Sequence, residues 1–354
     1  MQKKFLLLVI FSLFIFQTKC VLSFSIKSDK LNEIIKENAP IVYLHSNDHY
    51  RPGNVDDYLK ATDLYKGSKN LGTASEHDLK KIDKHHRLKI NNTHIIRGNI
   101  EKSKTYVRVK HEHKSLYIQY FFFYPYNGAG VLKLHTSVKS SSKIDLHPFG
   151  EHQGDWEHIT IRLNDKDFDI EHIYLSQHSS GKSLSKDDMT FEHGHPVIYS
   201  SRHGHAIYHD HGSHLSSTFH KHFKKCINVY FTKKCKSVFT VRGGLRNDCD
   251  ENGIKYDSSE HCSLIAVENI SGIKLSSPNW YYFKGRWGPD NEVSCDEFAS
   301  RILHFIPKET CILKWCVNPR KEVIKVIKNA IPDKAYGNGP TGPIEKGWDV
   351  KKLK

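Results

Sequence analysis

The sequence predicts a mainly β protein, an antiparallel β-sandwich with peripheral helices and long loops. From Tyr106 onward the chain breaks into short runs rich in β-branched and aromatic residues, such as YVRVKH, WEHITIRL and SVFTVRG. Gly, Asn, Asp or Pro separates these runs at intervals of roughly 10–25 residues, which is typical of sheets built from antiparallel strands. Regular alternation of strands with helices, which would indicate a parallel sheet, does not occur in this part of the sequence.

Residues 1–23 are predicted to form a secretory signal peptide. Two lysines precede an apolar run from Phe5 to Phe16, which is too short to span a bilayer. Residues 24–354 are expected to form a single domain, because no segment rich in Pro, Gly and Ser marks a boundary. We therefore expect the mature protein to be secreted or to reside in the lumen of the secretory pathway or vacuole.

The individual elements follow from apolar spacing and turn residues. Apolar side chains three and four positions apart predict a helix over residues 28–39, which Pro40 ends. The other elements are expected in this order: a strand over residues 40–45, a helix over 54–65, the short strands after Tyr106, a basic helix over 213–231 and a helix over 322–331.

The chain is basic, with a formal net charge of +14. A basic surface attracts phosphates, anionic lipids or acidic glycans. The Lys and Arg residues are spread along the chain without the aromatic interleaving of nucleic-acid-binding surfaces, so no nucleic acid partner is expected. Two Asn-X-Ser/Thr motifs, at Asn91 and Asn269, are typical of a secreted glycoprotein.

Seven of the eight cysteines lie in the second half of the chain. In an oxidising compartment they predict up to three disulfide bonds with one thiol left over, and the absence of a Cys-X-X-Cys pair argues against a structural zinc site. Residues 248–260 begin like a calcium-binding loop, but Ser259 stands where that loop needs Glu. We interpret this segment as a turn pinned by Cys249 and Cys262.

The clearest functional pattern is GEHQGDWEHITIRL, residues 150–163. Strand alternation places Asp155 and Glu157 on one face, with later core residues, and Trp156 on the other. His152 lies in the preceding turn and can fold back to the same point. One imidazole and two carboxylates suit a divalent cation such as Mg²⁺, Ca²⁺ or Mn²⁺, with open positions for a ligand. The alternative is that Asp155 caps a turn and Glu157 forms a salt bridge.

Histidine is unusually frequent, with 25 residues, and many of them follow the expected strand PVIYSS. His203 and His205 flank a glycine there, and either can complete a metal site or act as a general base. His178, at the end of another expected strand, is a further candidate. Three other histidines are interpreted as solvated loop residues: His209, His211 and His214.

Seven ordered segments carry a resemblance to a known family. They are APIVYLH (39–45), YFFFYPYNG (120–128), GEHQGDWEH (150–158), YLSQHSSG (174–181), HPVIYSSRHGHAIY (195–208), GLRND (244–248) and WYYFKGRWG (280–288). In this order they resemble the vacuolar protein sorting-associated protein 62 family over nearly all of the mature chain. The resemblance implies a link to vacuolar trafficking and no settled biochemical activity.

The segment that ends in Asp-Trp-Glu is also similar, more distantly, to a heptad of the secreted necrosis-inducing protein family. The resemblance implies a β-sandwich with a divalent-metal site that binds sphingolipid headgroups and serves to damage membranes. The residues that match metal-binding or functional positions of that family are His152, Asp155, Glu157, His205 and, approximately, Asp145. Gly154 stands where that family has a second His, so the role of that His is unfilled here.

Three functional hypotheses follow. The leading one is a secreted or vacuolar protein whose divalent cation binds an anionic, glycan or lipid-headgroup ligand, with His203, His178 and Trp156 as ligand-binding candidates. The first alternative is a metal-dependent hydrolase, of phosphodiesters for example, in which His205 or His178 moves a proton. The second is a structural trafficking protein without a metal. The sequence has no G-x-S-x-G or P-loop motif, so serine hydrolases and P-loop nucleotide-binding enzymes are not expected.

Overall fold

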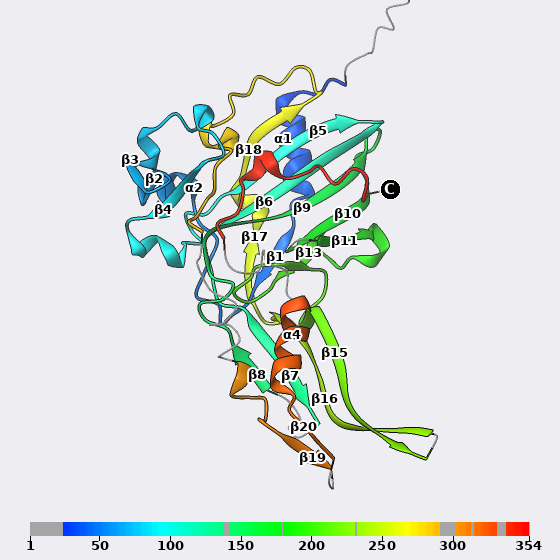
Figure 1. Ribbon diagram of the computed structural model, residues 1–354. Coiled ribbons are helices and arrows are strands. Elements are labelled where there is room, and N and C mark those ends of the chain that lie inside the picture. The colour runs from blue at the N-terminus through cyan, green and yellow to red at the C-terminus, as the bar shows by residue number, and fades with distance from the viewer. Residues whose placement is uncertain are drawn as a thin grey trace, which may run out of the picture.

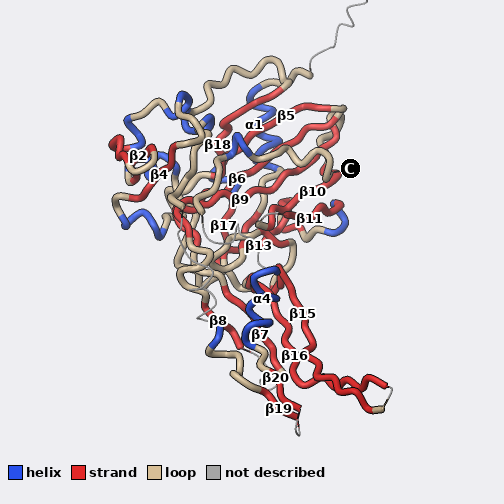
Figure 2. The backbone as a smooth tube through the Cα atoms, in the orientation of Figure 1, coloured by secondary structure: helices blue, strands red, loops and turns tan. Residues whose placement is uncertain are grey.

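The computed structural model describes residues 24–137, 142–178, 180–230, 232–290, 302–312, 315–330 and 338–353. The predicted signal peptide lies outside these residues. The protein is mainly β, as the sequence predicts. Figures 1 and 2 show a large body of packed sheets and an elongated arm that extends from it.

A six-stranded sheet forms the centre of the body. Its strands lie in the order β11 (Ser180–Ser185), β10 (Ile170–Gln177), β9 (His152–Asn164), β6 (Ser115–Asn127), β5 (Thr105–Glu112) and β18 (Cys262–Glu268). All neighbours are antiparallel except β18 and β5, which are parallel.

A second sheet packs against one face of the central sheet. It contains β12 (Phe191–Glu192), β13 (His195–Ser200), β1 (Ile41–Leu44) and β17 (Ile254–Asp257), with β14 (Ile207–Tyr208) paired to β13. β1 and β13 are parallel, so the sandwich is predominantly but not wholly antiparallel. Helix α1 (Ser28–Glu37) contributes Leu31, Ile34 and Ile35 to the shared apolar core.

Alternation along β6 and β9 divides the body into two cores. Tyr124 on β6 and Ile159 on β9 point into the core between the two sheets. Phe123 and Trp156 point to the opposite face, into an aromatic core. That face is covered by α2 (Val55–Lys60), by a small sheet of β3 (Lys69–Thr73), β2 (Thr62–Lys66) and β4 (His86–Ile90), and by the segment around Trp280 and Trp287.

The arm is a separate four-stranded sheet with its own apolar core. Its order is β15 (Gly212–Val229), β16 (Thr232–Cys249), β7 (Val131–Thr136) and β8 (Ser142–Asp145). Helix α4 (Arg320–Ala330) and the hairpin of β19 (Thr310–Ile312) and β20 (Trp315–Val317) lie beside it in Figure 1. The core of the arm includes Phe149, Phe219 and Phe239. Single 3₁₀ turns complete the fold: η1 (Ala74–Glu76), η2 (Leu79–Lys81), η3 (Thr93–Arg97), η4 (Lys186–Asp188), η5 (Ser258–His261), η6 (Asn279–Tyr282) and η8 (Pro343–Glu345).

Two predicted helices need correction. The expected basic helix over 213–231 is wrong, because this segment forms strand β15, paired with β16 over most of its length. Phe219 and Phe223 are four residues apart, a spacing that shares one face in a strand as well as in a helix, and both are buried. The helix expected over 54–65 ends at Lys60, since Thr62 begins strand β2. The helices near residues 28 and 322 and the strand at 41 are confirmed.

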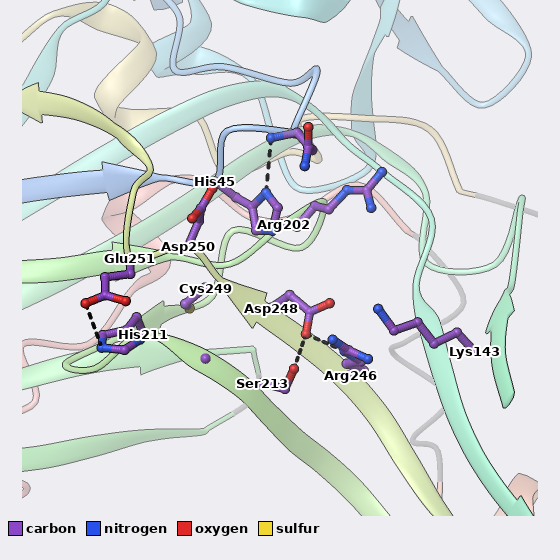
Figure 3. Close-up of a pocket in the computed structure, with 12 residues that line it drawn as sticks. His45, Lys143, Arg202, His211, Ser213, Arg246, Asp248, Cys249, Asp250 and Glu251 are labelled. Atoms are coloured by element: carbon purple, nitrogen blue, oxygen red, sulfur yellow. Dashed lines mark hydrogen bonds and ion pairs between the residues drawn. The ribbon is translucent and has the colours of Figure 1, made fainter. Parts of the chain in front are cut away.

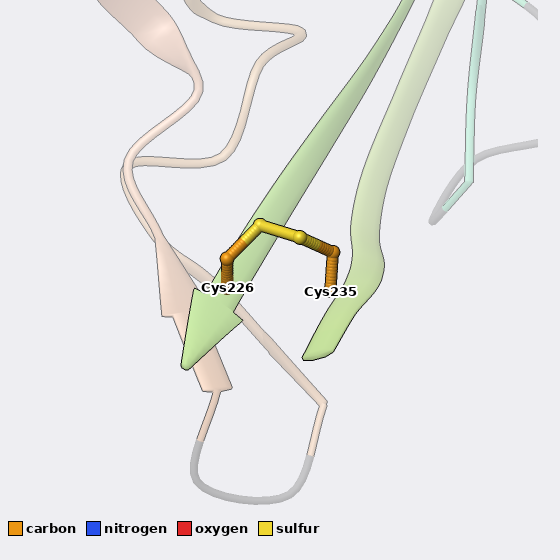
Figure 4. The surroundings of a disulfide bond; sticks show 2 residues. All are labelled: Cys226 and Cys235. Carbon is orange, nitrogen blue, oxygen red and sulfur yellow. A yellow bond between two sulfur atoms is a disulfide. The ribbon is translucent and has the colours of Figure 1, made fainter. Parts of the chain in front are cut away.

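Two disulfide bonds join cysteines on adjacent strands of hairpins, Cys226 to Cys235 (Figure 4) and Cys311 to Cys316. The predicted turn pinned by Cys249 and Cys262 is wrong, because both are free thiols. Asp250 closes that turn instead: its side chain accepts hydrogen bonds from Ser46 and from the backbone N–H of Asn252. Cys295 lies outside the described residues.

Candidate functional site

Five acidic and histidine residues gather where β9 begins, at the edge of the core between the two sheets. Asp155 and Glu157 come from β9, His152 from its first residue, Asp48 from the loop after β1, and His205 from the turn between β13 and β14. We call Asp48, His152, Asp155, Glu157 and His205 the acid–histidine cluster. Asp48, Asp155, Glu157 and His205 are buried, with relative exposures of 4%, 6%, 7% and 1%.

His205 connects the two aspartates of the cluster. Its Nδ1 donates a 2.9 Å hydrogen bond to Asp155 Oδ2, and its Nε2 lies 3.7 Å from Asp48 Oδ2. The ring stacks on Tyr124 with 3.7 Å between ring centroids. Burial opposes ionisation of Asp155, but the hydrogen bond from His205 and the positive charge of Lys346 hold the pKa of Asp155 below its ordinary value.

Glu157 behaves in the opposite way. Burial and the neighbouring negative charge of Asp155 raise the pKa of Glu157 to about 8. Its carboxyl group accepts a hydrogen bond from the Ser176 hydroxyl, whose oxygen in turn accepts a 3.0 Å hydrogen bond from the backbone N–H of His158. Two adjacent buried carboxylates cannot both ionise cheaply, so a proton or a cation must offset one of the charges.

His152 is oriented by the turn that precedes the strand. Its Nδ1 donates a 2.8 Å hydrogen bond to the Gly154 carbonyl oxygen, which leaves Nε2 with its lone pair. Removal from water lowers the pKa of His152, so this ring is neutral near pH 7. Gly154 has φ +64°, and a β-carbon there would lie 2.5 Å from the Trp287 carbonyl oxygen. The second His of the related heptad therefore has no room here.

The turn at residues 201–205 carries three buried polar atoms for which the described part of the chain offers no hydrogen-bond partner: Ser201 Oγ, Arg202 Nε and His205 Nε2. His203 and His205 both have left-handed backbone conformations, with φ of 68° and 51°. The backbone N–H of His203 donates a 2.6 Å hydrogen bond to Asp48 Oδ2, which ties this strained turn to the cluster. Unpaired buried polar groups in a strained turn are typical of functional sites.

An open pocket of about 410 Å³ adjoins this turn (Figure 3). Three of its cationic side chains, Lys143, Arg202 and Arg246, lie on one side of it in Figure 3. Asp248 accepts hydrogen bonds from Arg246 and Ser213. The complete lining is His45, Asn47, Lys143, Arg202, His211, Gly212, Ser213, Arg246, Asp248, Cys249, Asp250 and Glu251.

The other predicted site residues lie around the cluster rather than in it. His203 Nδ1 donates to the Ala129 carbonyl oxygen, and His178 Nε2 pairs with Asn247 Oδ1 at 2.8 Å. Trp156 is 1% exposed inside the aromatic core, on the opposite face of β9. Asp145 is exposed at the end of β8, where it accepts a hydrogen bond from the backbone N–H of His147.

Of the three histidines predicted to lie in a loop, two do and one does not. His209 and His211 lie in the loop before β15, whereas His214 belongs to β15 and stacks on Tyr208 at 3.9 Å. Asp48 and Ser176 were not predicted as site residues. Asp48 follows a predicted strand, which is the only local signal that it offers.

We looked for places where three or more His, Cys, Asp or Glu side chains bring possible metal-ligand atoms within 4.8 Å of one another. Among the described residues there is one such place, formed by Glu309, Cys311 and Cys316. Both of those cysteines are in a disulfide bond, so they are not thiolate ligands. In the acid–histidine cluster, Asp155 and Glu157 point instead toward His205 and Ser176 respectively.

The fold and the cluster together define a β-sandwich protein with a buried acid–histidine site beside a polar pocket of mixed charge. The chain belongs to the vacuolar protein sorting-associated protein 62 family, whose model matches residues 15–351. It is 23% identical to vacuolar protein sorting-associated protein 62 of Saccharomyces cerevisiae, over 90% of this chain and 66% of that protein. It is 27% identical to TDA6 of the same organism, also described as vacuolar protein sorting-associated, over 65% of this chain and 41% of that protein. The chain thus spans less than two thirds of the length of either relative.

Solved structures that match part of the chain include necrosis and ethylene inducing protein 2 from the causal agent of witches' broom disease of cocoa. It shares 16% identity, with a TM-score of 0.30, over 50% of this chain and 67% of that chain. Another is NLPPya in complex with glucosamine, with 15% identity and a TM-score of 0.31 over 53% of this chain and 71% of that chain. Within the described residues, no helix combines the length and apolar character needed to cross a membrane.

Proposed function

We propose that this chain is a ligand-binding protein of vacuolar or secretory-pathway sorting, in which a divalent cation at the acid–histidine cluster helps to bind an anionic, glycan or lipid-headgroup ligand. Mg²⁺, Ca²⁺ and Mn²⁺ are the cations that its donors suit. The family to which the chain belongs supports the sorting role. The single observation that carries the cation is the burial of Asp155 and Glu157 beside each other.

The donor types suit a hard cation, and Asp155 and Glu157 would have to turn from His205 and Ser176 to converge on it. Asp155 and Glu157 supply carboxylate oxygens, and His152 supplies a neutral imidazole whose other nitrogen is held by a backbone carbonyl, as is usual for a metal-binding histidine. A bound cation would offset the charge that otherwise keeps Glu157 protonated, so it would replace the proton. It would also supply an electropositive centre for an anionic or hydroxyl-rich ligand.

The side of the pocket that carries Arg202 supports an anionic ligand. Arg202 borders both the pocket and the strained turn, and its buried Nε has no hydrogen-bond partner among the described residues. A phosphate, sulfate or carboxylate group of the ligand would satisfy this donor. Lys143 would add positive charge on the same side of the pocket, whereas Asp248 offsets the charge of Arg246.

We favour binding over hydrolysis because one candidate proton carrier, His205, is buried, and the other, His178, is exposed but has its Nε2 engaged by a neighbouring side chain. His205 is 1% exposed beneath its contacts with Tyr124 and Asp155, and His178 Nε2 is paired with Asn247. A hydrolase would need one of these nitrogens to reach a substrate. Incubation with a generic phosphodiester, with and without chelator, separates the two functions, since metal-dependent turnover is expected only for a hydrolase.

Calorimetric titration of the purified protein with Mg²⁺, Ca²⁺ and Mn²⁺ tests the proposal directly. We expect wild type to bind one of these ions and Glu157→Gln to lose at least tenfold in affinity, because the variant removes one anionic ligand. Glu101→Gln changes an exposed carboxylate outside the cluster and serves as the matched control. If wild type takes up no ion in titration or elemental analysis, the cation-dependent function is refuted.

A further inference from the structure

The outer part of the β15–β16 hairpin extends beyond the rest of the arm (Figures 1 and 2). β7 pairs with β16 only between Val241 and Arg246, so within the described residues the hairpin has two strands beyond that point. The Cys226–Cys235 bond links these strands close to the turn (Figure 4). We call residues 221–230 and 232–236 the finger. Its cross-link keeps a two-stranded ribbon, which is marginal in isolation, in a fixed register.

The charge of the finger is entirely positive. The sequence has no Asp or Glu between Asp210 and Asp248. No acidic side chain therefore stands opposite a lysine anywhere in the hairpin register. The exposed lysines of the finger are Lys221, Lys224, Lys225, Lys233, Lys234 and Lys236.

The register concentrates three of these charges on one face. Lys225 is paired directly with Lys236, and Lys234 follows two positions along the same strand, so the three side chains share a face. Like charges directly opposite each other destabilise a hairpin. A partner that carries several negative charges would relieve this repulsion.

The tip adds an aromatic side chain to the charge. Tyr230 is 96% exposed, far more than the next exposed large apolar residue, Leu215 at 44%. The sequence around it, INVYF, is apolar on both sides. Tyrosine is favoured at the boundary between lipid and water, because its ring is apolar and its hydroxyl group is polar.

We propose that the finger docks the protein on a lipid bilayer that contains anionic headgroups. The lysines approach the headgroups, and Tyr230 enters the interface between headgroups and acyl chains. An exposed aromatic side chain at the tip, with lysines behind it, suits a bilayer, whose headgroups are charged and whose interior is apolar. An acidic polysaccharide would use the lysines but would leave the tip in water. This surface is distinct from the acid–histidine cluster and requires no cation.

Vesicle flotation with the purified full chain tests this docking. Vesicles of phosphatidylcholine alone are compared with vesicles that also contain phosphatidylserine, in the presence of chelator and at low and high salt. We expect binding only to the anionic vesicles, with weakening at high salt. The triple variant Lys225→Gln, Lys234→Gln and Lys236→Gln should bind about a hundredfold more weakly, since each lysine near such a surface contributes about fivefold to the affinity.

A matched triple variant controls for net charge. Lys60→Gln, Lys84→Gln and Lys166→Gln remove the same charge from exposed sites elsewhere in the chain and should leave vesicle binding within a fewfold of wild type.

The single variant Tyr230→Ser separates insertion from attraction. It should weaken binding to anionic vesicles while keeping the salt dependence. Equal losses in both triple variants, or retention of the acidic polysaccharide heparin without any binding to vesicles, would overturn the proposal. Circular dichroism and a thiol assay verify that each variant folds and keeps its disulfide bonds.

Discussion

Replacing Glu157 by Gln should make the metal-free protein more stable near neutral pH. Burial and the charge of Asp155 raise the pKa of Glu157 from 4.5 to about 8 in the folded protein. The native state therefore holds a proton that the unfolded chain releases, and stability falls as the pH rises between these two values. Gln has nearly the same shape, accepts the Ser176 hydrogen bond and never ionises.

The size of the effect follows from the proton that the native state retains. One proton corresponds to about 1.4 kcal/mol per pH unit between the unfolded and the folded pKa values. Between pH 5 and pH 7 the stability of Glu157→Gln relative to wild type should therefore rise by about 3 kcal/mol. The lowered pKa of His152 also makes stability depend on pH, but that dependence is present in both proteins and largely cancels in the difference.

Urea unfolding at pH 5, 6, 7 and 8 in the presence of chelator measures this difference. Glu101→Gln, at an exposed position outside the cluster, should show no change with pH beyond that of wild type. A stability difference between Glu157→Gln and wild type that stays flat from pH 5 to pH 8 would mean that Glu157 is ionised in the folded protein throughout. The argument that the buried carboxylate pair needs a proton or a cation would then fail.

Two further substitutions test the cluster and the turn that orients it. His205→Phe keeps the stacked ring but leaves the buried Asp155 without its partner, so thermal and urea unfolding should show a loss of about 3–5 kcal/mol. His214→Phe, at a partly exposed stacked histidine, should cost less than about 1 kcal/mol, and equal losses would contradict the ion-pair argument. Gly154→Ala, whose β-carbon would meet backbone, should be destabilising by more than about 2 kcal/mol in the same assay. Gly67→Ala has a similar φ but open space and should cost about 1 kcal/mol, so similar values for the two would refute the steric account.

The part of the site that lies on β9 could be predicted because strand periodicity is a local property. Asp155 and Glu157 share a face with Ile159 and Ile161, and Trp156 points the other way, as the alternation of the sequence predicts. His205 was a candidate from its place after a strand and from a family resemblance. Its contact with Asp155, 50 positions away, comes from the packing of two sheets.

Other features depend on contacts that no local pattern specifies. Asp48 meets the backbone of His203 across 155 positions, and nothing in the loop after β1 indicates this contact. The cysteine pairing shows the same limit. Cys226 pairs with Cys235 across one hairpin, whereas Cys249 and Cys262 are also close in sequence but belong to strands of different sheets.

Strand β16 connects the finger to the pocket. Its length limits whether the finger and the pocket can contact the same membrane. It runs from Thr232 near the tip to Asp248 in the pocket lining. At about 3.3 Å per residue, a strand of this length separates the two regions by up to about 50 Å. If β16 stands upright on the bilayer, the cluster lies too far away to reach a headgroup of that bilayer, and its ligand must be soluble or belong to a second surface. If β16 lies flat, both regions can contact the same bilayer, and the cation should then strengthen binding to vesicles. The two proposals are thus independent in their chemistry but linked in their geometry through a single strand.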